Sequence, residues 1–535
     1  MHVITADEAA RLIRDGDTIL TGGSGSGHAV PDALMAAVER RFLAEGHPHG
    51  ITSIHPVGLG DRGDRGAGHF AHKGLLKRIV CGTYMDSPKI SKMALADEIE
   101  AYTMPQGVTS QLVREMAAGR PGLITRTGLE TFVDPRRGGM RQSPSAKDDL
   151  VETIAIDGET WLRFKPFRID ATFLRGTTAD EDGNVSMEQE AIYGEMLSMA
   201  QAAHNQGALV IVQVKRLAKR GALPAKSVKI PGMLVDFVVV EPTQTQTFFT
   251  EYSPAYAGEL RIPLDDIPPL AFDERKVIAR RAALELRHHA ICNLGSGVST
   301  GIAAVAAEEN ALDLIMLTNE QGLIGGAPSG GLEPGAASNY HAIVDQPYQF
   351  DFYDGGGLDI AFLSFVEIDE SGNVNVSRFG GMVTGIGGFV NISQGARMTV
   401  FSGTFTAAGF EFAWPGGRMA IRKEGKHRKF VRRVGQLSYN GAYALERERK
   451  ALFVTERAVF RLVPGGVELI EIGPGVDLER DVLAHMEFRP KIAADLREMD
   501  AAIFRPERYG LADRIRRNPQ PPRSKRLAEW VAARR

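Results

Sequence analysis

An internal repeat constrains the fold of this chain more than any other feature of its sequence. Residues 169–186 (IDATFLRGTTADEDGNVS) match residues 358–375 (LDIAFLSFVEIDESGNVN) at a constant offset of 189 positions. Eight identities fall in register: Asp170, Phe173, Leu174, Asp180, Glu181, Gly183, Asn184 and Val185 recur as Asp359, Phe362, Leu363, Asp369, Glu370, Gly372, Asn373 and Val374. Duplication on this scale predicts two homologous domains and argues against a solenoid of short repeats.

Both halves open with the same succession of elements. An apolar strand, a loop of small residues and an apolar helix are expected over 17–38 and again over 290–306. This order, repeated through the chain, predicts open α/β domains with parallel strands. The first helix is expected within residues 1–16, where Thr5 and Glu8 have capping-box spacing.

Prolines and charge mark the domain boundaries. Four prolines between 254 and 269 predict a linker at 256–273, which separates an N-terminal domain (1–255) from a C-terminal domain (274–510). A basic, proline-bearing tail follows at 511–535. We expect it to be docked or frayed, with a nucleic-acid-binding arm as the alternative.

The composition favours work on small molecules. A hydrophobic content of 43% and a net charge of -3 give no basic excess to attract nucleic acid or anionic lipid. No apolar run reaches membrane-spanning length. Cys81 and Cys292 offer neither a disulfide framework nor metal-ligand spacing, which suits a reducing compartment. We therefore expect a cytoplasmic protein without a metal or redox cofactor.

Glu320 is the leading candidate for a reacting group. It stands in LTNEQGLIGG (317–326), after the apolar run 312–317, which predicts a buried strand, and before a cluster of glycines. Open α/β sheets gather ligands at the carboxyl ends of strands, and a glycine-lined loop lets a substrate approach the main chain closely. Taken alone, the segment favours a solvated loop glutamate over a reacting group.

Two other motifs suggest different chemistry. GLGDRG (58–63) fits a dinucleotide-binding pattern, but no apolar helical face follows it at once. GVSTG (297–301) fits a nucleophile elbow, for which Ser299 would need an acid and one of the later histidines, His341, His427 or His485. A glycine loop before a helix suits anion binding or capping equally well, so we interpret Ser299 as a loop or capping residue.

Four segments near Glu320 carry a specific resemblance: NEQGLIGGAPSGG (319–331), FDFYDGGGLD (350–359), DESGNVNVSRFG (369–380) and GIGGFVNISQGA (385–396). They resemble the family I CoA-transferases, in particular the fused single-chain acetate or short-chain acyl-CoA transferases that include propionate CoA-transferase. Segments 68–82, 100–112, 129–136 and 452–462 extend the similarity over almost the whole chain. The two-half layout agrees, since relatives carry the halves as separate subunits.

The resemblance implies a ping-pong mechanism that exchanges coenzyme A between an acyl-CoA and a carboxylate such as acetate, with no cofactor besides the CoA substrate. By resemblance, Glu320 is the nucleophile that forms a glutamyl-CoA thioester, and the Asn375 side chain and the Gly388 N–H are the oxyanion donors. The implied contacts to CoA or the acyl group are Gly325, Gly326, Gly385, Gly387 and Gln106. A homodimer or homotetramer is also implied.

Several alternatives stay open. Asn375 could instead be a turn residue whose side chain bonds its own backbone. The first copy of the repeat has Ser186 at the position of Asn375, which is consistent with an acylating centre only in the second half. GSGVSTG (295–301) lacks the proline of close relatives, so Ser299 and Thr300 put inherited acyl specificity in doubt.

A basic cluster within 418–433 could meet CoA phosphates or form the solvated face of a hairpin that turns near Glu424 and Gly425. Rival functions are an acyl-CoA hydrolase and a non-catalytic acyl-CoA-binding protein.

Overall fold

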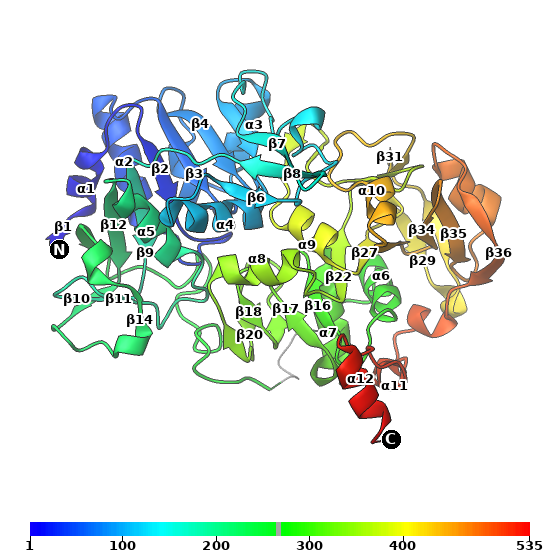
Figure 1. Cartoon of the computed structure of the whole chain (residues 1–535). Coiled ribbons are helices and arrows are strands. Elements are labelled where there is room, and N and C mark those ends of the chain that lie inside the picture. The colour runs from blue at the N-terminus through cyan, green and yellow to red at the C-terminus, as the bar shows by residue number, and fades with distance from the viewer. Residues whose placement is uncertain (264–268, 535) are drawn as a thin grey trace.

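The computed structural model describes residues 1–263 and 269–534, and it consists of two halves, each built on its own large sheet (Figure 1). The predicted linker at 256–273 is described only in part, because residues 264–268 lie outside the described residues. The first half, blue to green in Figure 1, ends its sheet at Val240, and the first helix of the second half begins at Glu274.

The first sheet is parallel throughout. Its strand order is β1 (His2–Ile4), β15 (Phe237–Val240), β12 (Leu209–Val214), β9 (Ala171–Arg175), β2 (Thr18–Thr21), β3 (Ile51–His55), β4 (Leu76–Cys81) and β5 (Glu100–Thr103). The helices of this half are α1 (Ala6–Leu12), α2 (Asp32–Glu45), α3 (Pro88–Leu95), α4 (Gln106–Ala117) and α5 (Met196–Asn205).

The second sheet has a parallel centre and antiparallel flanks. Its order is β21 (Ala342–Ile343), β18 (Leu323–Ile324), β17 (Met316–Thr318), β16 (Ile291–Leu294), β22 (Ile360–Ser364), β27 (Met398–Ser402), β33 (Lys450–Val454), β34 (Ala458–Val463), β35 (Gly466–Ile472) and β36 (Lys491–Glu498). Strands β17, β16, β22, β27 and β33 are parallel. The pairs β17–β18, β18–β21, β33–β34 and β34–β35 are antiparallel, and the edge strand β36 is parallel to β35.

Helices cover this sheet and form the C-terminal tail. They are α6 (Glu274–Ala283), α7 (Gly301–Glu308), α8 (Gln346–Asp354), α9 (Phe389–Gly395), α10 (Gly441–Glu446), α11 (Leu511–Arg517) and α12 (Lys525–Ala532). The tail is docked in part, since Leu511 and Ile515 are buried and Arg523 donates to Asp359, whereas α12 buries no residue. Among the described residues, no helix is both long and apolar enough to cross a membrane.

The prediction of open α/β domains with parallel strands is confirmed. Equivalent residues of the internal repeat also make equivalent hydrogen bonds in the two halves. In the first half, Thr18 N–H donates to the Asp170 carboxylate and Gly22 N–H to Phe173 O. Ile291 and Gly295 make the same bonds to Asp359 and Phe362, 189 positions after Asp170 and Phe173. Each repeated aspartate thus accepts a hydrogen bond from a backbone N–H at the start of the neighbouring strand.

Two expected elements differ from the structure. The first helix is shorter than residues 1–16: its Thr5–Glu8 capping box is present, but His2–Ile4 form β1 because they pair with β15. The strand expected over 312–317 begins at Met316, because Leu312–Leu314 form a 3-10 turn.

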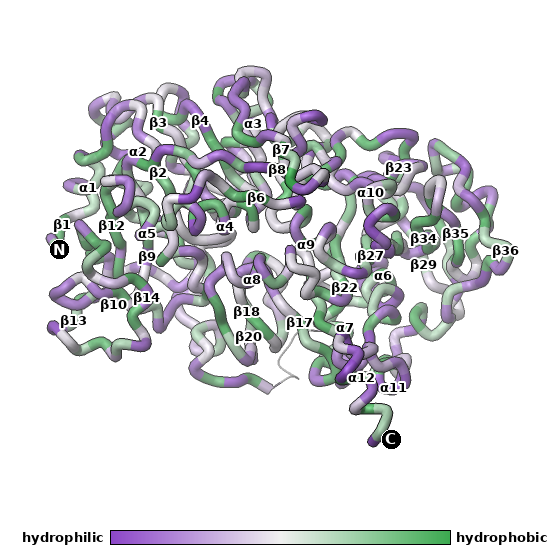
Figure 2. Tube along the Cα trace, viewed as in Figure 1, coloured by the Kyte–Doolittle hydropathy of each residue, from purple (hydrophilic) through white to green (hydrophobic). Residues whose placement is uncertain are grey.

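Hydrophobic residues concentrate in the sheets and their covering helices, and hydrophilic residues on the outer loops (Figure 2). One buried apolar cluster joins residues of both halves, including Met104 and Val108 beside Phe350 and Phe389. The halves therefore share a core where α4 packs against α8 and α9.

Candidate active site

Glu320 lies where β17 ends, at the edge of the sheet where the parallel strands have their carboxyl ends. The chain turns sharply after it. Gly322 has φ +100°, and a Cβ there would lie 2.0 Å from Val344 O, so this turn requires glycine. The Asn319 side chain accepts from Gln321 N–H, which fixes the backbone on either side of Glu320.

Burial sets the protonation of this carboxyl group. Although the residue keeps some exposure, desolvation raises the pKa of Glu320 to about 7, while hydrogen bonds from Gln321 and Asn293 oppose the shift. A carboxylate with a pKa near neutrality is a stronger base and a better nucleophile than a surface glutamate, yet it is still about half ionised at pH 7.

Gly388 lies beside the Glu320 carboxyl group. A Cβ built on Gly388 would meet Glu320 Cδ at 3.5 Å, Phe350 Cζ at 3.3 Å and Ile392 Cδ1 at 3.1 Å. Gly388 is also the residue before α9, and within the described residues no group accepts a hydrogen bond from its N–H. A free backbone N–H is the kind of donor that an oxyanion hole uses.

Gln106 brings the first half to the same place. It is fully buried at the start of α4, its N–H donates to Gly387 O at 2.9 Å, and its Oε1 lies 3.6 Å from a Cβ built on Gly387. That oxygen has no partner among the described residues. Unpaired buried carbonyls are rare, so the Gln106 side-chain oxygen is suited to accept a hydrogen bond from a substrate.

A buried polar network behind Gln106 was missed by the sequence reading. Gln106 Nε2 donates to Gln346 Oε1 at 3.2 Å, and Gln346 Nε2 donates to Glu195 Oε2 at 2.8 Å, where Ser110 also donates. Burial raises the pKa of Glu195 to about 7. These residues lie on different elements and share no motif, so no local signal could have revealed them.

Asn375 is placed differently from the oxyanion prediction. It is fully buried in β24 (Val374–Asn375), and its amide nitrogen donates to Glu367 Oε2 and Arg378 O, both at 2.8 Å. Its oxygen accepts from Ser377 N–H at 3.0 Å, as in the turn alternative. As folded here, Asn375 has no amide hydrogen left for an oxyanion.

The four other predicted glycines divide into two groups. Gly325 and Gly326 have positive φ and pack against His341 and the Ser338 carbonyl, and Gly385 packs against Gly82 and Thr83 of the first half. These three permit close packing within the protein. Only Gly387 leaves open space beside Gln106.

The loop after β2 closes the site from the first half. Ser24 Oγ accepts from Gln321 Nε2 at 3.3 Å, and the buried His28 bonds Pro334 O at 3.2 Å through Nε2. Residues next to Glu320 therefore touch both halves, and the site belongs to the junction between them.

The structure does not support a catalytic or dinucleotide-binding role for the GVSTG and GLGDRG motifs. Ser299 is buried, and no described residue bonds its hydroxyl, histidines included. GLGDRG leads into bends and a short 3-10 helix (Gly66–Phe70), with no α-helix directly after it.

The basic cluster is mostly solvated, but its predicted turn is wrong. Strand β29 (Glu411–Ala413) pairs with β30 (Ala420–Lys423), and β28 (Thr406–Ala407) pairs with β31 (His427–Arg428). The hairpin therefore turns at 414–419, and Glu424 instead accepts a bond from Arg457. Lys429 differs from its exposed neighbours because it lies over Phe365, where burial lowers its pKa to about 8.

A partly buried glutamate lies beside a free backbone N–H at the junction of two duplicated α/β halves, an arrangement suited to acyl transfer. The family model of coenzyme A transferase matches residues 3–241. The chain is 42% identical to caffeate CoA-transferase of Acetobacterium woodii, over 95% of this chain and 98% of that protein. The chain therefore belongs to the coenzyme A transferase family and is a CoA-transferase.

Two further relatives agree. The acetate CoA-transferase YdiF of Escherichia coli K12 is 41% identical over 94% of this chain and 95% of that protein. The crystal structure of the acyl-CoA transferase YdiF from Escherichia coli O157:H7 superposes with a TM-score of 0.91, at 40% identity over 95% of this chain and 97% of that chain. The same enzyme has also been solved as a thioester complex with CoA, with a TM-score of 0.91.

Proposed function

We propose that this protein transfers CoA between a short-chain acyl-CoA and a carboxylate such as acetate, through a thioester on Glu320. The observation that supports it most is the position of Gly388: a Cβ built on it would lie 3.5 Å from Glu320 Cδ, and its N–H has no acceptor among the described residues. The relatives named for acetate and caffeate, and the thioester complex of the Escherichia coli enzyme, point in the same direction.

The proposed first half-reaction consumes the donor acyl-CoA. A Glu320 oxygen attacks the thioester carbonyl carbon and the C–S bond breaks. CoA thiolate is released, and a mixed anhydride between Glu320 and the donor acyl group is formed. The thiolate then attacks the Glu320 carbonyl of that anhydride, which releases the donor carboxylate and forms glutamyl-CoA. The Gly388 N–H stabilises the oxyanion of each attack, and Gln106 contacts the acyl group or the pantetheine chain.

The second half-reaction reverses these steps with the acceptor. Its carboxylate attacks the glutamyl thioester, CoA thiolate leaves, and the thiolate attacks the acceptor carbonyl of the new anhydride. The products are the acceptor acyl-CoA and free Glu320. A homo-oligomeric, cytoplasmic enzyme remains part of this proposal on the family resemblance.

Initial rates with propionyl-CoA and acetate test the proposal. We expect acetyl-CoA to form in amounts equal to the propionyl-CoA consumed, with parallel double-reciprocal lines as the acetate concentration varies. Release of free CoA at a rate independent of acetate would replace the transferase proposal by the hydrolase alternative.

A further inference from the structure

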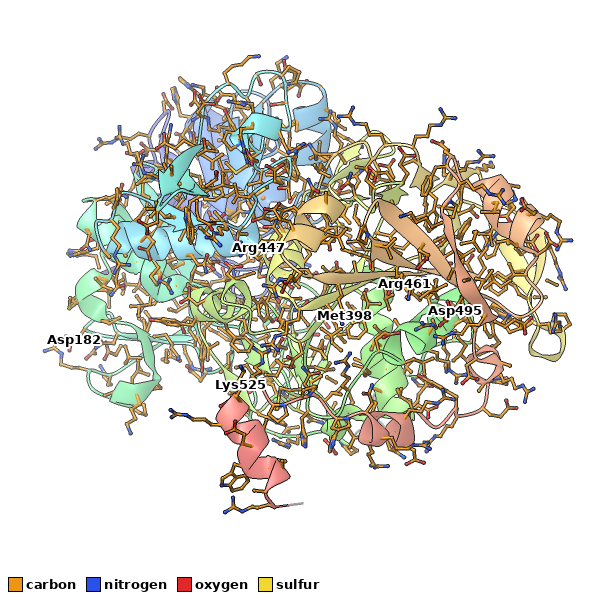
Figure 3. The ribbon with its side chains drawn as sticks, turned by 45° about the vertical axis from the view of Figure 1, so that its right-hand side comes forward. Asp182, Met398, Arg447, Arg461, Asp495 and Lys525 are labelled. Carbon is orange, nitrogen blue, oxygen red and sulfur yellow. The ribbon has the colours of Figure 1, made fainter. Side chains whose placement is uncertain are left out.

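A cavity lies between the two halves, away from Glu320. Its volume is about 240 Å³. The first half contributes residues of β6 (Leu123–Thr125) and β8 (Glu159–Phe164), and the second half contributes the ends of α8 and α9 and the region of α10. Figure 3 shows Arg447, one of its lining residues, in the middle of the molecule where cyan and orange ribbons approach each other.

Two helices separate this cavity from the catalytic edge of the sheet. Helix α8 begins at Gln346, which bonds Gln106, and ends at Asp354, which lines the cavity. Helix α9 follows Gly388 and ends at Gly395, which also lines the cavity. The cavity therefore lies near the edge where β22, β27 and β33 begin, opposite the edge that carries Glu320.

The cavity collects positive charge without enough carboxylates to balance it. Arg126, Arg447 and Arg449 line it. Arg126 pairs with Glu159 at 2.7 Å, but Arg447 and Arg449 form no ion pair with any described residue. Burial, and then the charges of Arg447 and Arg397, lower the pKa of Arg449, so the field at this arginine is positive.

Buried donors in the cavity lack acceptors. Tyr439 is 2% exposed and its hydroxyl has no partner among the described residues, and the same holds for Nε of Arg126 and of Arg449. Such groups are costly to bury unpaired, so an acceptor from outside the chain would satisfy several of them at once.

The rest of the lining is compatible with an anion that carries a flat body. The Arg126 guanidinium lies over one face of the Trp161 ring, 4.3 Å from its centroid, and the aromatic side chains of Trp161 and Tyr443 both line the cavity. Asp354 is the acidic residue in the lining; Asn391 donates to both of its oxygens at 3.0 Å, and burial raises its pKa to about 7. Its negative charge is therefore reduced near neutral pH.

We propose that this cavity is a second ligand site, which binds a small aromatic or similarly flat carboxylate through Arg447, Arg449 and the Tyr439 hydroxyl, with the flat body against Trp161. A carboxylate bound by Arg449 would pair its unpartnered Nε, and Arg447, which is exposed at the cavity, would add a second positive charge. The volume is below the roughly 300–1,000 Å³ of sites for drug-sized ligands, which excludes a whole CoA molecule.

Fluorescence of Trp161 tests the proposal directly. In the full chain with Trp414→Phe and Trp530→Phe, Trp161 is the remaining tryptophan, since the sequence has three. Benzoate should change its emission saturably, whereas benzamide, which has the same shape without the charge, should not. Arg449→Gln should weaken benzoate binding by at least about tenfold, as expected for loss of a charged hydrogen bond.

Three further variants keep the test decisive. Arg397→Gln, which removes a nearby charge outside the lining, should change the affinity by less than about twofold, and Tyr439→Phe, which deletes only an unpaired hydroxyl, should weaken it several-fold. Glu320→Ala should bind benzoate like the parent. No saturable response, equal binding of benzamide, equal effects of Arg449→Gln and Arg397→Gln, or loss of binding in Glu320→Ala would overturn the second site.

Discussion

The two halves repeat the same scaffold, but they differ in the residue that follows one strand: β3, which pairs with β2 in the first half, and β17, which pairs with β16 in the second. Pairing matches Leu20 with Ile54 in the first half and Asn293 with Thr318 in the second. Two residues after these partners stand Pro56 and Glu320, so a proline occupies the place of the carboxylate. The sheet is thus present twice, whereas the carboxylate at this place is present only in the second copy.

The repeated Asp-Glu-x-Gly-Asn turn shows the same division. Asp180 and Asp369 each accept from the backbone two and four residues later at 3.0 Å, and Asn184 and Asn373 each accept from a glycine N–H far along the chain. The turn is therefore structural in both halves. The two halves therefore share this turn although they differ at the position of Glu320.

The largest effect should come from removing the carboxylate that distinguishes the halves. Glu320→Ala should lower CoA exchange by at least about 10³-fold, since loss of a covalent nucleophile leaves only binding contributions. Pro56→Ala, at the matching place in the first half, should stay within about threefold of the parent. Exchange rates with propionyl-CoA and acetate measure both, and comparable losses would abolish the proposed asymmetry.

Crowding of the Glu320 carboxyl group should have the next largest effect. Gly388→Ala places a methyl group 3.5 Å from Glu320 Cδ and 3.1 Å from Ile392 Cδ1, and the resulting shift should slow exchange by about 10- to 100-fold. Gly330→Ala, on the exposed loop after Glu320, should leave kcat unchanged. Equal kcat values for the two variants would show that Gly388 has no role in the reaction.

The rate of glutamyl-CoA formation should follow the ionisation of Glu320. Its pKa is raised to about 7, so the reactive carboxylate declines as pH falls below 7, and the single-turnover rate should fall about tenfold per pH unit there and level off above pH 8. Asp354→Asn is the control, because its carboxyl group also has a pKa of about 7 but lies in the separate cavity. If Asp354→Asn shifted the pH–rate profile, the titrating group would be Asp354 and not Glu320.

Asn375→Ser introduces the residue of the first copy into the second. Because both amide hydrogens of Asn375 are bonded within the protein, exchange should stay within about threefold. The Glu367 carboxylate and the Arg378 carbonyl, which are only partly buried, lose a donor, which costs roughly 1 kcal/mol of stability. Rates and thermal melts measure the two effects. A rate loss of about 10²–10³-fold would instead support the oxyanion role predicted from the family resemblance.

The smallest effect compares the strand-tying aspartates. Asp170→Asn and Asp359→Asn should each weaken one bond to a strand start, at about 1 kcal/mol. Asp359 is 4% exposed and also accepts from Arg523 at 2.8 Å, so its variant should be the less stable of the two by melting temperature. Identical melting temperatures would show that the docked tail adds nothing measurable.

The sequence was sufficient for features carried by local or repeated patterns. The register of the duplication, the Thr5–Glu8 cap and the position of Glu320 after a strand all follow from neighbouring residues. Features made by distant contacts were out of reach. β1 exists because it pairs with β15, and the Asn375 amide is occupied because Glu367 and Arg378 fold onto it. The Gln346–Glu195 network joins the two halves without any motif.

Intact-mass analysis tests the central claim most directly. The protein is incubated briefly with propionyl-CoA without acceptor. One portion is digested and mapped, and a second, undigested portion is treated with acetate. We predict a CoA-sized adduct on the peptide that carries Glu320, discharged by acetate with formation of acetyl-CoA. An adduct on a peptide of the first half, or turnover to acetyl-CoA with no covalent intermediate under single-turnover conditions, would contradict a mechanism centred on Glu320.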